Sequence, residues 1–386
     1  MECQMELSPS ELTRSGAARR DARLDAIRGF LLVIMAAVHV PTPLSQALHE
    51  PFGFTSAAEG FVFLGACLAG RVYGNTYTRS GWLAMARRVW ARGKVVYLMH
   101  LGVVMPMALL AWTAGSHVAG LANQFHDFLQ HPWESLALMP LLLHQPPLFD
   151  ILPLYVVLLA ATPLAMRAAR RAGWTPVLAV SAALWLAAQF KLEARLLGNP
   201  AHWLPVRCSS FNFMAWQFLW IAGLATGETS LRQPIIGRQC RAAVGMSAGV
   251  LVLVGLLARH GLWPQTLFSP HLYSWMDKWT LGPLRLLNFG AWVVFLLTWN
   301  PRLPAVFAPL SLLGRNSLAV FTFHIPLVIG ATLLIQACAP TAAVQVVIGL
   351  YVIALLFPWA AWQEWPPAAP APAPAPQSGA AAPVAA

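Results

Sequence analysis

Residues 25–39 read DAIRGFLLVIMAAVH. An acid, Asp25, and a base, Arg28, open an apolar run that a histidine, His39, closes. With the residues that follow, the run reaches the ~20 apolar residues that a membrane-spanning helix needs. Ionisable side chains are costly at membrane depth, and they usually face the interior of a helical bundle or a water-filled cavity. The stretch therefore indicates a membrane helix with a polar stripe.

The composition extends this interpretation to the whole chain. Of the 386 residues, 58% are hydrophobic and 10% are charged, and the mean hydropathy is +0.60. Soluble domains carry about 25% charged residues. The apolar residues form long runs, without the short-range alternation that is typical of outer-membrane β-barrels. We therefore expect an all-α integral membrane protein.

Ten apolar runs are long enough to be membrane spans. Their expected boundaries are 26–45, 57–74, 95–114, 148–166, 175–190, 210–227, 242–260, 284–300, 316–338 and 343–362. The two longest connections, 115–147 and 261–283, are long enough to suggest a function or a lid. No internal repeat is evident, which argues against a transporter built from duplicated halves.

The distribution of basic residues predicts the topology. With ten spans, eighteen Lys and Arg residues fall on the side of the N-terminus and six on the opposite side. The positive-inside rule then places both termini in the cytoplasm. The net charge of +11 is explained by this asymmetry, so we do not expect nucleic acid as a partner.

The domain organisation follows from the same pattern. We expect a cytoplasmic segment over residues 1–22, a transmembrane domain over 23–363 and a disordered Pro/Ala-rich cytoplasmic tail over 364–386. The first residues lack the apolar region of a cleavable signal peptide, so the first span is expected to be retained. Five cysteines without metal-ligand spacing predict neither a metal site nor a permanently bound cofactor.

Arg28 and His39 lie eleven residues apart, close to three full turns of an α-helix, so both side chains face the same direction. Asp25, three residues before Arg28, is within reach of an ion pair on that helix. A simpler interpretation is that Arg28 reaches the head groups and that His39 bonds a neighbouring helix. We instead expect polar groups from several spans to meet in one wet crevice.

Glu59 lies near the outer end of the second span, at about the depth of His39. It is either a carboxylate of the first helical turn or the group that orients His39 as a general base. The small residues that follow, in the pairs Gly65/Ala69 and Ala66/Gly70, predict a close helix contact.

Three further stretches contribute polar groups to the spans. Asp150 precedes Pro153 at the start of the fourth span, which is typical of an N-cap. The sixth span begins with polar and aromatic side chains that we include as candidate ligands of a substrate: Asn212, Trp216 and Gln217. Trp216 is also explained by the interfacial aromatic belt. In the ninth span, His324 lies near mid-membrane, two residues before Pro326.

These motifs resemble a known family. The stretch RGFLLVIMAAVH (28–39), an arginine followed by a histidine at this spacing, resembles the acyltransferase-3 superfamily. The ordered stretches LDAIRGFLLVIMAAVHVPTPL (24–44), PFGFTSAAEGFVFLGACLAGRVYG (51–74), LFDILPLYVVLLAATPL (148–164) and AWQFLW (215–220) resemble its OpgC branch. Members of that branch are succinyltransferases of osmoregulated periplasmic glucans.

The resemblance implies a ten-helix O-acyltransferase of the bacterial inner membrane. It would move an acyl group, succinyl by resemblance, from cytoplasmic acyl-CoA as co-substrate to hydroxyls of a periplasmic glucan or another glycan. His39 would be the base or the residue that handles the acyl group, and Arg28 would face the acyl donor or support that site. Independently of the resemblance, Glu59 is the candidate that orients His39, and Asp25, Asp150 and His324 are candidate ligands of the substrate.

The chemistry of the remaining groups leaves alternatives open. Asn212 or Gln217 is a candidate donor to the developing oxyanion. The alternative function is a transporter or flippase that uses the same polar residues as a proton or substrate pathway, and a weaker alternative is a membrane scaffold. The sequence leaves open the acyl group, the acceptor and the oligomeric state.

Overall fold

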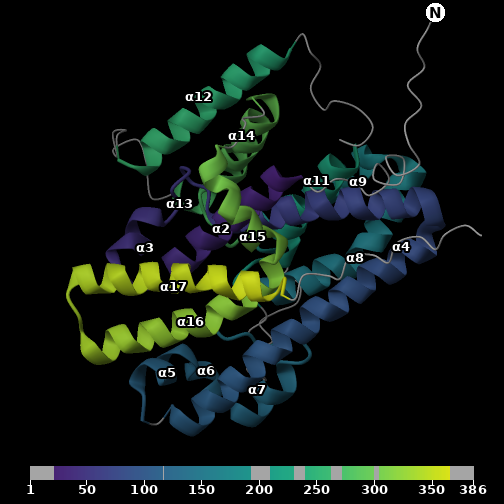
Figure 1. Cartoon of the computed structure of the whole chain (residues 1–386). Coiled ribbons are helices and arrows are strands. Elements are labelled where there is room, and N and C mark those ends of the chain that lie inside the picture. Colours follow the sequence, from purple (N-terminus) through teal and green to yellow (C-terminus); the bar gives the residue numbers. More distant parts are fainter. Residues whose placement is uncertain are drawn as a thin grey trace, which may run out of the picture.

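The computed structural model describes residues 21–115, 117–192, 209–229, 240–261, 272–299 and 304–365. Every regular element in these ranges is a helix, which confirms the all-α prediction (Figure 1). Residues 1–20 of the expected cytoplasmic segment, 366–386 of the Pro/Ala-rich tail and 262–271 of the second long loop lie outside the described residues.

Five of the described helices are long and apolar enough to cross a membrane: α4 (Ala57–Ala114), α8 (Ile151–Ala172), α12 (Arg241–Arg259), α16 (Ser317–Cys338) and α17 (Ala342–Trp362). Shorter or more polar helices occupy the other expected spans: α2 (Ala22–His39), α9 (Trp174–Gln189), α11 (Phe213–Thr229) and α14 (Pro283–Trp299). These helices support a membrane protein, and the number of ten crossings stays a prediction.

Three expected boundaries differ from the structure. The first helix, α2, ends at His39 instead of continuing to residue 45, because Pro41 cannot continue an α-helix and Pro43 begins a new helix, α3 (Pro43–Leu48). The second and third expected spans are the two arms of α4, 57–80 and 82–114, which meet at a non-helical kink at Gly81; the arms continue past the expected boundaries at residues 74 and 95. Gly81 has φ 78°, a conformation that glycine adopts readily. The two arms of α4 form a V (Figure 1).

Helical segments also occupy the connections between the long helices. The first long loop folds into three short helices, α5 (Ala119–Gln124), α6 (His126–Gln130) and α7 (Pro132–Leu138). A four-residue helix, α13 (Leu272–Trp275), lies in the second long loop. The segment η3 (Ala305–Phe307) and helix α15 (Ala308–Arg315) lead into α16.

Small residues bring two pairs of helices together. A Cβ atom on Gly314 of α15 would overlap the carbonyl oxygen of Asp25, so the backbones of α15 and α2 are in direct contact where the helices cross. On α4, a Cβ atom on Gly70 would overlap the carbonyl oxygen of Leu224 in α11, and Ala66 faces Gly223 in the same way. The close contact predicted from the small residues of the second span is therefore confirmed.

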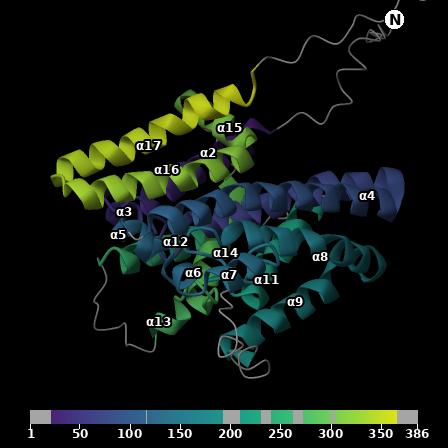
Figure 2. The same cartoon turned by 90° about the horizontal axis from the view of Figure 1, so that it is seen from below.

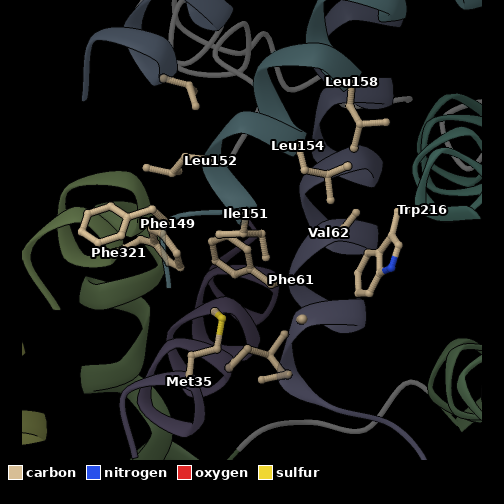
Figure 3. Close-up of a cluster of buried hydrophobic side chains, with 14 of the residues drawn as sticks. Met35, Phe61, Val62, Phe149, Ile151, Leu152, Leu154, Leu158, Trp216 and Phe321 are labelled. Carbon is tan, nitrogen blue, oxygen red and sulfur yellow. The ribbon is translucent and has the colours of Figure 1, made fainter. Parts of the chain in front are cut away.

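The apolar core lies where α2, α4, α8 and α16 meet. Figure 3 shows Phe61 of α4 in the centre of this core, with Ile151 beside it, Phe321 of α16 nearby and Met35 of α2 below. Helices α16 and α17 pack as a hairpin along one side of the molecule, while α8, α9 and α11 lie on the other side of α4 (Figure 2).

The polar side chains gather at two ends of the bundle. We call one the Arg28 end. It contains Arg28 and also Arg170, which bonds both the Gly74 carbonyl oxygen and Glu228. The other is the His39 end, where Arg285 contacts Glu50. The contacts within each end join loops that the charge count assigns to the same side of the membrane.

Candidate functional site

Arg28 joins α2 to the start of α16. Its guanidinium donates a hydrogen bond to Ser317 Oγ and lies 3.9 Å from Asp25, one turn earlier on the same helix. The ion pair between Asp25 and Arg28 is the one that the three-residue spacing predicts. The hydrogen bond and the ion pair position the arginine, and both charges are largely shielded from solvent.

A cavity of about 220 Å³ adjoins Arg28. Its polar lining comes from side chains of α2, α4, α8, α11 and α16, namely Arg28, Tyr73, Arg92, Tyr155, Trp220 and Ser317. The rest of the lining is mainly apolar and includes Phe61 and Phe321. Two guanidinium groups in an otherwise apolar cavity suit a ligand with negative charge and a narrow uncharged chain.

At the opposite end of α2, His39 contacts His324. The Nδ1 atom of His39 lies 3.3 Å from Nε2 of His324, and the two rings stack with centroids 5.5 Å apart. His324 is 2% exposed, whereas His39 is half-buried. Arg28 and His39 thus both meet α16, as the three-turn spacing on α2 predicts.

The hydrogen bonds of this pair fix its tautomers. Nδ1 of His324 contacts the backbone carbonyl oxygen of Phe321, which can only accept, so Nδ1 carries the proton. Nε2 of His324 is then the acceptor, and the contacting Nδ1 of His39 is its donor. The remaining ring nitrogen of His39, Nε2, therefore holds a lone pair in the neutral dyad, as a general base requires.

An aromatic pair separates the cavity from the histidines. Phe61 and Phe321 line the cavity and stack with centroids 6.1 Å apart, and Phe321 also contacts the ring of His324 at 4.7 Å. Neither histidine lines the cavity. The expectation of a single crevice that contains both Arg28 and His39 is therefore wrong for this conformation, because Phe61 and Phe321 border the cavity and Phe321 lies against His324.

Glu59 does not orient His39. It lies in the first turn of α4, where it forms a capping box with Ser56, so the helix-start interpretation is confirmed. Its other oxygen pairs with Arg285 of α14, and both side chains are almost completely buried. The expected contact with the imidazole is absent among the described residues because Arg285 and Ser56 engage this carboxylate.

Arg285 is the centre of a buried ion network that the sequence analysis did not identify. It lies 2.6 Å from Glu50, which also pairs with Arg259 at 2.9 Å. Burial by itself raises the pKa of Glu50, but the charge and hydrogen bond of Arg285 and the bond from Arg259 outweigh it and lower the pKa. An arginine at the start of an apolar span was the available signal, and it was assigned only to the topology.

Asp150 lies at the N-cap position of α8, as the sequence suggests, but its side chain makes no capping hydrogen bond. Its backbone is already helical, with φ −76° and ψ −27°, whereas an N-cap residue typically has a non-helical conformation. The side chain instead accepts a hydrogen bond from the backbone N–H of Ser210 at 3.0 Å. Asp150 therefore ties α8 to the segment that precedes α11.

The three candidates at the start of α11 have structural partners. Gln217 bonds both the hydroxyl and the carbonyl oxygen of Ser181 in α9, so its amide is engaged. Asn212 accepts from the backbone N–H of Ala215 in the first turn of α11. Trp216 is fully buried and donates its indole N–H to the carbonyl oxygen of Trp279. Gln217 is thus a poor oxyanion donor, and the interfacial-belt interpretation of Trp216 is wrong.

Lys278 completes the His39 end and was also not singled out by the sequence analysis. Its ammonium lies 5.2 Å from the ring centre of Trp279 and 5.9 Å from that of Phe211. Its charge also acts on His39 and on Glu59. The lysine therefore belongs to the same end of the molecule as the histidine dyad.

The fold and the site define a helical membrane protein with polar groups at both ends of α2, Arg28 at one end and the histidine dyad at the other. The sequence profile of the OpgC protein family matches residues 20–367. The chain therefore belongs to the OpgC family, which implies a role as a transferase. None of the curated proteins and none of the solved structures compared with the chain matches it.

Proposed function

We propose that this protein is a membrane O-acyltransferase. It transfers an acyl group, succinyl by family resemblance, from cytoplasmic acyl-CoA to hydroxyl groups of a periplasmic glucan in the bacterial inner membrane. The observation that supports this best is the His39–His324 dyad, because its hydrogen bonds leave a lone pair on Nε2 of a half-buried His39.

The proposed reaction uses this lone pair as a general base. Nε2 of His39 takes the proton of a sugar hydroxyl while the sugar oxygen attacks the thioester carbonyl. The tetrahedral intermediate then collapses, the C–S bond breaks, and the CoA thiolate receives the proton from His39. The positive charge that forms on His39 is stabilised through Nδ1–H, which donates to His324.

The donor would enter at the Arg28 end. Arg28 and Arg92 line the cavity there, and guanidinium groups suit the phosphates or the thioester oxygen of acyl-CoA. A cavity of about 220 Å³ suits the narrow acyl-pantetheine arm better than the nucleotide. Because Phe61 and Phe321 separate the cavity from the dyad, transfer requires these rings to move apart as the arm enters.

The acceptor would bind at the His39 end. Phe211 and Trp279 pack edge to face there at 5.4 Å, and the ring of Trp279 is 44% exposed. Exposed aromatic rings offer an apolar surface to the C–H face of a sugar ring. In the predicted topology this surface faces the periplasm, where the glucan is.

The test uses the purified full-length protein in detergent, labelled succinyl-CoA and a glucan. We expect the wild type to transfer label and His39→Ala to lose activity by about 100-fold or more. The matched control is His126→Ala, which removes an exposed histidine of α6 and should transfer normally. Equal activity of wild type and His39→Ala would exclude His39 as the base.

The alternative function, a transporter or flippase, is favoured by one observation: polar groups at both ends of α2 are separated by an aromatic pair, as in a gated pathway. Proteoliposomes decide between the two. Accumulation of glycan or protons without transfer from any acyl-CoA would overturn the transferase proposal.

A further inference from the structure

The segment that carries Lys278 is fixed in place. Asp277 accepts hydrogen bonds from the backbone N–H and the hydroxyl of Thr280 at 2.8 Å and 2.6 Å. The carbonyl oxygens of Thr280 and Leu281 accept from Gln189 and Trp185 of α9. The turn between α13 and α14 is thus bonded to α9, so the position of Lys278 is defined by the fold.

Its ammonium has no ion-pair partner among the described residues. No carboxylate oxygen in these ranges lies within 4.0 Å of Nζ, and the contacts of the ammonium are with the rings of Phe211 and Trp279. The acids close enough to act on it electrostatically are Glu59, Glu50 and Asp150.

Each of these acids is engaged elsewhere. Glu59 and Glu50 bond to Arg285, and Asp150 accepts from the backbone N–H of Ser210. These three acids favour the charged form of Lys278, but they form no hydrogen bond with its ammonium among the described residues. Burial lowers the pKa of Lys278, with Arg285 acting in the same direction, while the three acids oppose the shift.

A half-buried cation that lies over two aromatic rings, with open donor sites and within electrostatic range of the proposed base, suits an anionic part of a substrate. We propose that Lys278 binds the free carboxylate of a dicarboxylic acyl group and thereby selects the acyl donor that is transferred. This inference rests on the proposed acyltransferase function, and it assigns to Lys278 the recognition of the donor, a short chain with a thioester at one end and a carboxylate at the other.

The two other groups that could bind at the His39 end, the glucan and the oxyanion of the reaction, need a lysine less than a carboxylate does. A glucan offers neutral hydroxyls, which aromatic rings and amide groups bind without a full charge. An oxyanion that forms during transfer needs donors held rigidly at one atom, whereas lysine is a point charge on a flexible stem. A carboxylate two methylenes away from the reacting carbonyl suits that flexible stem better.

The experiment compares two donors of the same chain length, succinyl-CoA and butyryl-CoA, which differ in the terminal carboxylate. Purified full-length wild type should prefer succinyl-CoA. Lys278→Met should lose about 10- to 100-fold in kcat/KM for succinyl-CoA, the range of a charge-assisted hydrogen bond, and change little for butyryl-CoA. Lys278→Arg should recover part of the loss, and Lys191→Met, at an exposed lysine, is the control.

An equal loss on both donors would overturn the inference, because it would show that Lys278 acts on the oxyanion or on the fold. No loss on either donor would overturn it as well. Equilibrium binding of the two donors separates this result from failure of the proposed function. If the wild type binds succinyl-CoA more tightly than butyryl-CoA and Lys278→Met does not, while neither transfers to glucan, the recognition stands and the transferase proposal fails.

Discussion

At the scale of single residues, His324 is a positioning residue for His39. It joins the Phe321 carbonyl to Nδ1 of His39, and this chain of bonds decides which nitrogen of His39 is basic. In His324→Ala the ring of His39 loses its orientation. We expect kcat to fall by about 100-fold with KM for acyl-CoA little changed.

His324→Gln keeps a side chain that accepts from His39, so it should recover part of kcat. A merely structural role would reduce the amount of folded protein and leave kcat per folded molecule unchanged. Thermal unfolding followed by intrinsic fluorescence, measured beside the kinetics, distinguishes the two. Equal kcat in all three proteins would remove His324 from the mechanism.

Glu59 and Arg285 are expected to control stability, because the pair is buried and each partner neutralises the other. Glu59→Gln leaves the guanidinium with Glu50 as its remaining acid. We expect a loss of about 3 kcal/mol in the free energy of unfolding, at the low end for a broken buried pair. Glu134→Gln, at an exposed position of α7, is the control, and chemical unfolding in detergent is the measurement.

Glu50 gives the stability a defined pH dependence. Its pKa in the folded state is lowered from the ordinary value of 4.5, so its contribution is complete above about pH 4.5. The contribution is lost as the pH falls through the lowered pKa of the folded state. The Tm of the wild type should therefore exceed that of Glu50→Gln at neutral pH, and the difference should disappear on acidification. A difference that grows with acidity would contradict this assignment.

At the scale of elements, the apolar runs are sufficient to predict most helices. Helices α12, α14, α16 and α17 begin and end within about one residue of the predicted spans, because long apolar runs leave little choice of structure in a bilayer. The predictions failed where polar residues continue a helix, as in the middle of α4. They also failed at Pro41, which ends α2 early.

The contacts of the site were much harder to predict than the helices. The face shared by Arg28 and His39 follows from helical periodicity, which is a local property. The partners Ser317, His324 and Arg285 come from segments more than 200 residues away, and periodicity does not say which helices are neighbours. The sequence analysis therefore offered His39 as the partner of Glu59, whereas the partner is Arg285. It included Lys278 only in the count of basic residues.

The crossing of α2 and α15 gives a prediction at this scale. In Gly314→Val, the added side chain would overlap the backbone of Asp25, which cannot move away without separating the helices. Because Asp25 lies one turn from Arg28, we expect a lower Tm by several degrees together with weaker acyl-CoA binding. Gly330→Val on α16, where a Cβ meets nothing within 4 Å, is the control.

At the scale of the whole molecule, the two ends have different tasks in the proposed reaction. The Arg28 end holds the cavity with two arginines, and the His39 end holds the dyad, Lys278 and an aromatic surface. A donor that enters from one side and an acceptor that stays on the other meet only if the acyl arm passes Phe61 and Phe321. This arrangement fits transfer across a membrane only if the Arg28 end faces the cytoplasm.

That orientation can be tested by labelling single cysteines in intact cells. In a background without the five native cysteines, His126→Cys lies beyond the His39 end and Arg87→Cys lies near the bend of α4. A thiol reagent that cannot cross the inner membrane should label His126→Cys in intact cells. The eighteen basic residues on the side of the N-terminus predict that this side is cytoplasmic, and residue 126 lies on the opposite side. Arg87→Cys should react only after the cells are permeabilised. The reverse pattern would place the dyad in the cytoplasm, where a periplasmic glucan has no access to His39, and the proposed direction of transfer would be wrong.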